Sequence, residues 1–263
     1  MKNYIASEWQ ATLKSQNLHS FHDIWNYEKN ANLEQDWVEE PNQRRGGWSG
    51  VCRIVLQDPR GQPKTVFLKR QSKHTYSSLL SPIKGRLTFR REFRNITRFR
   101  KHGIPTVTPI YYGQWEDEAI LMTEELTGYR SLDDWILEWQ QKGFPSRELY
   151  QRIIQEIGRV VRKMHQYCYR HSCLEFKHIF LSLENNEVKV SLIDLEKLRY
   201  WPFRNRCRNV DLTRLYRKCA KKVKRTDKWR FIKAYWGEDA SKEKVKSLWR
   251  SVDALVAKKN NKR

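Results

Sequence analysis

The sequence predicts a two-lobed α+β fold, in which a small β-rich N-terminal lobe with one helix precedes a larger helical C-terminal lobe. Short runs of β-branched and aromatic residues between turn residues dominate residues 36–126. In residues 127–257 the apolar side chains recur mostly at helical spacing. A loop over residues 171–178 then leads into a β-hairpin that ends at Asp194. With 263 residues, of which 39% are hydrophobic, the chain can bury a substantial core.

The N-terminal lobe is expected to contain a small sheet. Its predicted strands cover residues 37–39, 51–56, 65–69, 108–112 and 119–123. A glycine-containing loop over residues 41–50 is expected to join the first two strands. A Pro- and Gly-containing turn over residues 58–63 closes the next hairpin.

One helix completes this lobe. It is predicted to run from about Thr88 to Gly103, because apolar residues follow a period near 3.6 and glycine commonly ends a helix. Glu92 lies inside this helix. Residues 1–35 are expected to form a helical extension ahead of the lobe, and residues 124–128 to connect it to the C-terminal lobe.

The C-terminal lobe shows two clear helix starts. Ser131, with Asp134 at the position of a capping box, begins one helix, and Ser146 begins a longer one. The remaining predicted elements are a hairpin of residues 179–181 and 188–193, helices over residues 211–256 divided at Gly237, and a basic tail over residues 258–263.

The charge of the chain indicates polyanionic partners. Its 52 Lys and Arg residues exceed its 30 Asp and Glu residues, and the formal net charge is +22. Such a field attracts nucleotides, nucleic acid, phosphorylated glycolipid or an anionic membrane leaflet. Dense basic clusters lie in residues 84–101, 204–208 and 218–225. No nucleic-acid-binding motif accompanies them, so nucleic acid is not expected as a partner. Docking onto phosphorylated lipid headgroups and a merely solvated basic face remain as alternatives.

Three features bear on cellular location. No apolar run approaches the roughly 18 to 20 residues of a membrane span, and the first residues lack the apolar core of a signal peptide. The five cysteines are odd in number and irregularly spaced, which favours reduced thiols over a disulfide framework. We therefore expect a cytoplasmic protein.

The loop from His171 to His178 has the spacing of a phosphoryl-transfer catalytic loop, with Asp194 as the metal-binding carboxylate beyond it. Cys173 stands where such a loop carries its catalytic aspartate. A thiol with an ordinary pKa of about 8.5 is a weak general base at neutral pH. Loss of a general base slows a reaction roughly 10²- to 10⁴-fold. His171 and Glu175 are the nearby candidates to replace it.

A zinc site is an alternative use of the same segment. Its potential ligands are His165, Cys168, His171, Cys173 and His178. Their spacing matches none of the common structural zinc motifs, and the apolar residues after the last histidine favour a strand there.

A family resemblance rests on an ordered set of short segments. They are Arg44–Ser49 with its two glycines, Val66–Lys69, Arg91–Glu92, the loop of residues 171–178 with histidine at its end, and Leu192–Leu195. Over about residues 36–215 this set resembles the InaA-like branch of the Kdo/WaaP lipopolysaccharide kinase family. The resemblance implies a protein-kinase-like fold and a reaction that uses ATP and Mg²⁺ to phosphorylate a sugar hydroxyl of the lipopolysaccharide core. It also implies action at the cytoplasmic face of the inner membrane, with peripheral contact to that membrane.

The resemblance implies a role for each candidate residue. The nucleotide-binding candidates are Gly47, Gly50, Lys69, Glu92 and Glu125, around a cleft near residues 124–128. The metal-binding candidates are Asp194 and His178. The residues expected to face the acceptor hydroxyl are His171, Cys173 and Glu175. The alternative function is a catalytically impaired, kinase-like binding or regulatory protein for an anionic partner, because Cys173 replaces the catalytic aspartate.

Overall fold

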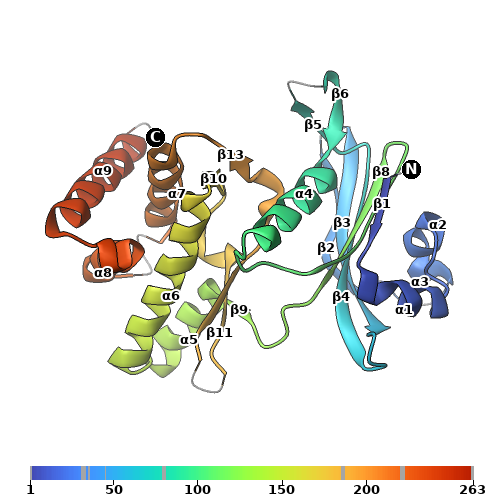
Figure 1. Ribbon diagram of the computed structural model, residues 1–263, viewed down its shortest axis with the longest axis horizontal. Helices are drawn as coiled ribbons and strands as arrows, with labels where there is room; N and C mark the ends of the chain where they lie inside the picture. Colours follow the sequence, from blue (N-terminus) through green and yellow to red (C-terminus); the bar gives the residue numbers. More distant parts are fainter. Residues whose placement is uncertain are drawn as a thin grey trace. The chain divides into compact units, whose positions relative to one another are not determined.

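The structure of the chain is a computed structural model, which describes residues 2–30, 34, 36–44, 46–78, 81–184, 187–219 and 223–261. The chain divides into two compact units. Unit 1 comprises Met1–Arg98 and Val107–Leu126, and unit 2 comprises Phe99–Thr106 and Thr127–Arg263. Unit 1 is built on a sheet, whereas unit 2 is mainly helical (Figure 1). The predicted α+β class, with a sheet-rich N-terminal part and a helical C-terminal part, is confirmed.

Unit 1 contains a six-stranded antiparallel sheet in the order β1-β7-β8-β4-β3-β2. Its strands are β1 (Lys2–Ile5), β2 (Asp36–Arg44), β3 (Gly47–Gln57), β4 (Pro63–Ser72), β7 (Pro109–Trp115) and β8 (Glu118–Glu124). A separate hairpin of β5 (Thr75–Ser78) and β6 (Ser81–Leu87), which the sequence analysis did not predict, leads into helix α4 (Thr88–Lys101). Gly103 follows α4 with a φ of +60°, a conformation that suits glycine at the predicted end of this helix.

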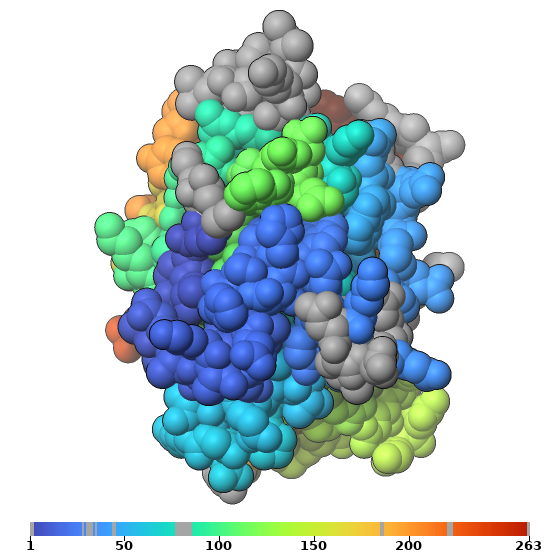
Figure 2. All heavy atoms as spheres, turned by 90° about the vertical axis from the view of Figure 1, so that its right-hand side faces the viewer, coloured from blue at the N-terminus to red at the C-terminus, as the bar shows by residue number. Residues whose placement is uncertain are grey.

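Helices cover both faces of this sheet (Figure 1). The N-terminal helices are the 3-10 helix η1 (Ser7–Trp9), α1 (Gln10–Ser15), α2 (Phe21–Trp25) and α3 (Tyr27–Asn30). Trp9 and Phe21 pack in one buried cluster with Val66 of β4, and Figure 2 shows the N-terminal segment in dark blue over this side of unit 1. Helix α4 lies on the opposite face, where Phe93 stacks on Tyr112 with ring centroids 4.8 Å apart.

Two expectations for unit 1 need correction. Residues 1–35 are not purely helical, because Lys2–Ile5 forms edge strand β1 against β7. Four residues are too few to show an alternating pattern, so only the pairing partner reveals this strand. The expected loop over residues 41–50 is instead mostly a β2–β3 hairpin. Pro41 suggested a loop, but it lies in an irregular stretch of edge strand β2, where the missing backbone N–H of proline is tolerated.

Unit 2 contains β9 (Arg130–Ser131), α5 (Leu132–Lys142), α6 (Arg147–Gln166), β10 (Tyr169–Arg170), η2 (Phe176–His178), β11 (Ile179–Ser182), β12 (Lys189–Leu192), η3 (Leu195–Lys197) and β13 (Arg199–Tyr200). Both predicted helix starts are confirmed. The Ser131 hydroxyl accepts the backbone N–H of Asp134 at 3.1 Å, and the Ser146 hydroxyl accepts that of Leu149 at 3.2 Å. The predicted hairpin before Asp194 is confirmed as β11 and β12.

The C-terminal helices differ from the prediction in number and start. They are α7 (Arg204–Lys218), α8 (Arg225–Trp236), the 3-10 turn η4 (Gly237–Asp239) and α9 (Lys242–Asn260). The prediction began this region at Asp211, because the preceding arginines gave no helical pattern of apolar residues. In the predicted basic tail, residues 262 and 263 lie outside the described residues. Among the described residues no helix is both long enough and apolar enough to span a bilayer.

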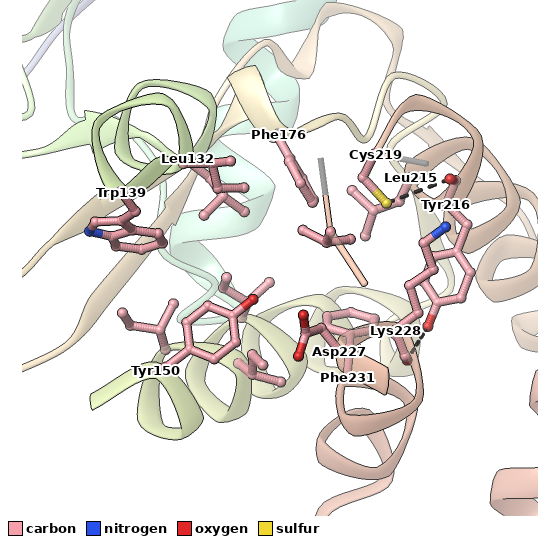
Figure 3. Close-up of a pocket in the computed structure, with 15 residues that line it drawn as sticks. Leu132, Trp139, Tyr150, Phe176, Leu215, Tyr216, Cys219, Asp227, Lys228 and Phe231 are labelled. Atoms are coloured by element: carbon pink, nitrogen blue, oxygen red, sulfur yellow. Dashed lines mark hydrogen bonds between the residues drawn. The ribbon is translucent and has the colours of Figure 1, made fainter. Parts of the chain in front are cut away.

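Side chains that come mainly from helices α5, α6, α7 and α8 line a small, partly open cavity of about 60 Å³ (Figure 3). Its lining is almost entirely apolar, and Trp139, Phe176 and Phe231 are among the side chains that surround it (Figure 3). None of the predicted site residues lines this cavity.

Candidate active site

Unit 1 brings two of the predicted residues into direct contact. Lys69 lies on central strand β4, paired with Val51 of β3 and Leu121 of β8. Its Nζ lies 2.6 Å from Oε1 of Glu92, which projects from helix α4. The Glu92 side chain is 6% exposed and that of Lys69 is 22% exposed. A buried carboxylate therefore holds a lysine that keeps some access to solvent, which is the arrangement needed to present a fixed positive charge to phosphate.

The two glycine candidates in unit 1 lie in a strand and not in the predicted loop. Gly47 and Gly50 are residues of strand β3. A Cβ on Gly47 would collide with the backbone oxygen of Ser72, and one on Gly50 would lie 2.6 Å from the Trp37 ring. Close packing thus explains both glycines without a phosphate. Glu125 follows β8, and its backbone N–H donates to the carbonyl of Thr65 at 3.0 Å.

In unit 2, a buried aspartate anchors the start of the loop from 171 to 178. The Asp211 carboxylate accepts the backbone N–H of His171 at 2.7 Å and that of Ser172 at 2.9 Å. His165 Nε2 lies 3.2 Å from the same carboxylate, and both side chains are fully buried. Ser172 has a φ of +67°. The two N–H groups therefore have a charged acceptor that holds the loop in an uncommon backbone conformation.

The His171 ring is part of this support. Its Nε2 lies 3.0 Å from the backbone oxygen of Ile193, the residue before Asp194. Burial is the main cause that lowers the pKa of His171 to about 4, so the ring is neutral at pH 7 and Nε2–H donates to the carbonyl. This ring orders the backbone next to Asp194, and its burial does not favour the predicted contact with an acceptor hydroxyl.

Cys173 is almost enclosed, with 5% of its surface exposed. Burial is the main cause that raises the pKa of its thiol above the ordinary value, and the nearby Lys197 charge only partly opposes this. The thiol is therefore protonated at neutral pH and cannot accept a proton from a substrate hydroxyl.

Glu175 is engaged by an arginine that the sequence analysis did not single out. Nε of Arg214 lies 2.9 Å from Glu175 Oε1, and Nη2 lies 2.5 Å from the same oxygen. Burial acts to raise the pKa of Glu175, but the hydrogen bonds and charge of Arg214 outweigh it, so the pKa is lowered. A carboxylate with a lowered pKa and a bound guanidinium is a weak base.

His178 and Asp194, the two metal candidates, are brought together. His178 Nε2 lies 3.3 Å from Asp194 Oδ2, and His178 Nδ1 lies 2.6 Å from the Cys173 carbonyl oxygen. A proton on Nδ1 satisfies that carbonyl, which leaves the Nε2 lone pair facing the carboxylate. Burial is the main cause that lowers the pKa of His178, which favours this neutral form. Two electron-pair donors that face each other fit a cation between or beside them.

In the described part of the chain, no third potential metal ligand joins His178 and Asp194. Among the described residues, no three His, Cys, Asp or Glu side chains form a group that could hold a metal ion. Mg²⁺ commonly takes one or two protein carboxylates together with substrate phosphates and water, so the Asp194 carboxylate suits this ion. His178 would then orient that carboxylate or the bound ion. The zinc alternative fits poorly. His165 bonds Asp211 and Tyr235, His171 bonds a backbone carbonyl, and the Cys168 thiol lies 3.7 Å from the carbonyl of Pro202.

Sequence reasoning missed Asp211 and Arg214 as functional residues. Asp211 is the only acidic residue between Glu196 and Asp227, in a stretch crowded with Lys and Arg. An isolated carboxylate within a basic helix was therefore the available signal for Asp211. No pattern in the sequence distinguishes Arg214 from its many basic neighbours.

Comparisons with known proteins agree with this picture. The family model "Lipopolysaccharide kinase (Kdo/WaaP) family" matches residues 28–235. Protein InaA of Escherichia coli is 32% identical over 208 residues, which cover 77% of this chain and 91% of that protein. Lipopolysaccharide core heptose(I) kinase WaaP of Pseudomonas aeruginosa is 27% identical over 158 residues, which cover 56% of this chain and 59% of the kinase.

Two further similarities concern sequence and fold. The 3-deoxy-D-manno-octulosonic acid kinase of Mannheimia succiniciproducens is 28% identical over 145 residues, covering 51% of this chain and 54% of that enzyme. A solved structure described as WaaP in complex with acyl carrier protein superposes with a TM-score of 0.68 at 20% identity. That superposition covers 100% of this chain and 98% of that chain, and it shows similarity of fold.

Proposed function

Because the chain belongs to the lipopolysaccharide kinase (Kdo/WaaP) family, we propose that it transfers the γ-phosphoryl group of ATP to a sugar hydroxyl of the lipopolysaccharide core, with Mg²⁺. In this reaction the hydroxyl oxygen bonds to the γ-phosphorus, and the bond from that phosphorus to the β–γ bridging oxygen breaks. ADP leaves, and the hydroxyl proton passes to solvent or to a base. Such a transfer depends mainly on positioning and on neutralisation of phosphate charge.

The observation that carries the proposal is the ion pair of Lys69 and Glu92. The pair joins a central strand to helix α4, and Glu92 is 4% exposed. A carboxylate this deeply buried holds the lysine ammonium in one place, which costs side-chain conformational freedom. An ion pair between two solvent-exposed side chains is common and contributes little, and burial distinguishes the Lys69–Glu92 pair from that kind. We assign Lys69 to nucleotide phosphate binding and Glu92 to holding Lys69 in position.

Asp194 and His178 are assigned to the metal. A bound Mg²⁺ would supply neutralisation of the charge that develops on the transferred phosphoryl group. Asp194 stands at the exit of β12 with a φ of +57°, and His171 orders the carbonyl just before it. His178 is oriented through its Nδ1 bond to the Cys173 carbonyl. These residues are thus set in position by the loop itself.

A second function is favoured by the chemistry of the loop. The Cys173 thiol is protonated, Glu175 is bound by Arg214, and the His171 ring is buried. Among the side chains of residues 171–178, no strong general base is therefore free at the catalytic aspartate position. This supports a slow kinase or a kinase-like protein that binds nucleotide and an anionic partner without efficient turnover.

The first test measures the melting temperature of the full chain with and without Mg-ATP. A ligand that binds the native state at 100 times its Kd stabilises it by about 2.7 kcal/mol, which is a shift of several degrees. We expect this shift in the wild type and in Lys64→Met. Lys64 is on the same strand, on the opposite face. We expect the Mg-ATP melting shift to be lost in Lys69→Met and in Asp194→Asn.

The outcomes separate the alternatives. A Mg-dependent shift that disappears in both site variants supports a nucleotide site, and phosphate transfer to lipopolysaccharide core oligosaccharide then distinguishes kinase from binding protein. Absence of any shift at millimolar Mg-ATP contradicts both functions. An equal shift in Lys69→Met would place the nucleotide elsewhere.

A further inference from the structure

The segment between β13 and α7 exposes two large aromatic side chains. Tyr200 is 60% exposed and Phe203 is 64% exposed, and they are the most exposed large hydrophobic side chains among the described residues. Both belong to unit 2, and Tyr200 follows Asp194 by six residues. Phe203 has no polar atom in its side chain, so its exposure to water has no local compensation.

Arginines surround these aromatic residues. From residue 197 to residue 208 the chain has five cationic and no acidic residues. In the described residues no carboxylate forms an ion pair with Arg199, Arg204 or Arg206. The resulting patch is both apolar and cationic. We call it the aromatic–arginine patch, and it consists of Arg170, Arg199, Tyr200, Trp201, Phe203, Arg204 and Arg206.

The patch is held in a fixed shape. Tyr200 and Arg199 pair with Tyr169 and Arg170 as a short antiparallel ladder. The backbone N–H of Trp201 donates to the Cys168 carbonyl at 2.8 Å. The backbone that carries the exposed rings is therefore ordered before any partner binds, which reduces the entropy lost on binding.

The Trp201 ring organises two of the arginines. The guanidinium carbons of Arg170 and Arg206 lie 5.5 Å and 5.0 Å from the centre of this ring. Arg204 Nη2 donates to the backbone oxygen of Gln166 at 3.2 Å. These contacts are to a π face and to a carbonyl, so the guanidinium charges are not neutralised.

We propose that the aromatic–arginine patch docks unit 2 onto an anionic lipid bilayer. Aromatic side chains are favoured at the membrane interface, and each nearby Lys or Arg adds to the attraction of anionic headgroups. A segment that begins five residues after Asp194 would then bind the same bilayer that carries a glycolipid acceptor. This biological purpose rests on the proposed function, whereas the docking itself does not.

The test is cosedimentation of the full chain with vesicles of phosphatidylcholine alone or with about one third phosphatidylglycerol. One variant combines Tyr200→Ser with Phe203→Ser, and another combines Arg204→Gln with Arg206→Gln. A matched control combines Val55→Ser with Leu137→Ser, which removes two other exposed apolar side chains, both 56% exposed. Circular dichroism and the Mg-ATP melting shift check that each variant folds.

We expect the wild type to prefer the anionic vesicles, and each patch variant to bind them about tenfold or more weakly. The control should bind as the wild type does. Vesicle binding that is unchanged in both patch variants overturns the proposal and leaves only general attraction by the net charge. Weak vesicle binding together with patch-dependent binding of single-stranded oligonucleotide overturns it in favour of nucleic acid.

The docking and nucleotide proposals can fail separately. Lys69→Met should still bind vesicles if only the patch is needed, and the patch variants should still show the Mg-ATP melting shift. A patch variant that loses the melting shift as well as vesicle binding would mean that the segment supports the fold. In that case the single variant Phe203→Ser, which removes only an exposed ring, must still weaken vesicle binding for the proposal to stand.

Discussion

His178 Nε2 lies 3.3 Å from Asp194 Oδ2, although the neutral imidazole presents a lone pair at this atom. The Nδ1 proton is used by the Cys173 carbonyl 2.6 Å away. Because the histidine is mostly buried, protonating Nε2 to relieve this contact is disfavoured by desolvation. A bound cation relieves it instead, and this geometry leads to the first prediction.

We predict that His178→Ala raises the Mg²⁺ concentration needed for half of the ATP-dependent melting shift by about tenfold or more, as loss of a metal-orienting partner typically does. The matched control is His19→Ala, which removes an exposed histidine 3.6 Å from a carboxylate oxygen of Asp23. An unchanged Mg²⁺ requirement in His178→Ala would show that this histidine only orders the loop.

Cys173→Asp should raise the rate of phosphate transfer by about 10²-fold or more if the chain is a kinase that lacks its general base. Cys173→Asn has nearly the same shape without the carboxylate, so it should give no gain. Single-turnover transfer of radiolabelled phosphate to core oligosaccharide measures both. No transfer by Cys173→Asp, with nucleotide binding intact, would identify the chain as a binding protein.

Asp211→Ala should destabilise unit 2 strongly. The substitution removes the acceptor of the His171 and Ser172 backbone N–H groups, and each buried N–H left without a partner costs roughly 1–3 kcal/mol. We expect a loss of about 2 to 6 kcal/mol in urea unfolding, against little change for the exposed Asp253→Ala. A loss below about 0.5 kcal/mol in Asp211→Ala would mean that the loop keeps its shape without this anchor.

Because of His171, the free energy of unfolding should decrease as the pH is lowered from 7 to 5. Its folded-state pKa is about 4, against 6.5 for a solvated imidazole, so in this range the unfolded chain binds a proton that the folded chain excludes. The contribution of the neutral His171 ring to the stability of the fold is fully present above pH 6.5 and is lost as the pH falls toward 4. The loss from pH 7 to pH 5 is about 2 kcal/mol for this group.

Urea unfolding at the two pH values measures this dependence. The wild type should lose about 2 kcal/mol more than His171→Phe does. If the variant does not fold, the ring C–H resonances of His171 in the wild type should show no titration down to pH 5. A midpoint near 6.5 in that titration would contradict the buried, neutral ring.

Much of the site was predictable because it depends on local patterns. The strand that carries Lys69, the helix that carries Glu92 and the hairpin that delivers Asp194 each show their periodicity in fewer than fifteen residues. The strand placement of the two β3 glycines was not predictable, for the opposite reason. Their requirement comes from Ser72 and Trp37, which are distant in sequence, and no local pattern distinguishes close packing from phosphate binding.

The sequence by itself determined the α+β class and the elements that carry Lys69, Glu92 and Asp194, because these follow from residue type and short-range periodicity. Only the tertiary structure decided how the loop works. Whether Glu175, His171 or Cys173 can accept a proton depends on Arg214, on Ile193 and on burial, and these arise from packing between segments far apart in the chain. Protonation is set by surroundings, and surroundings exist only once the chain has folded.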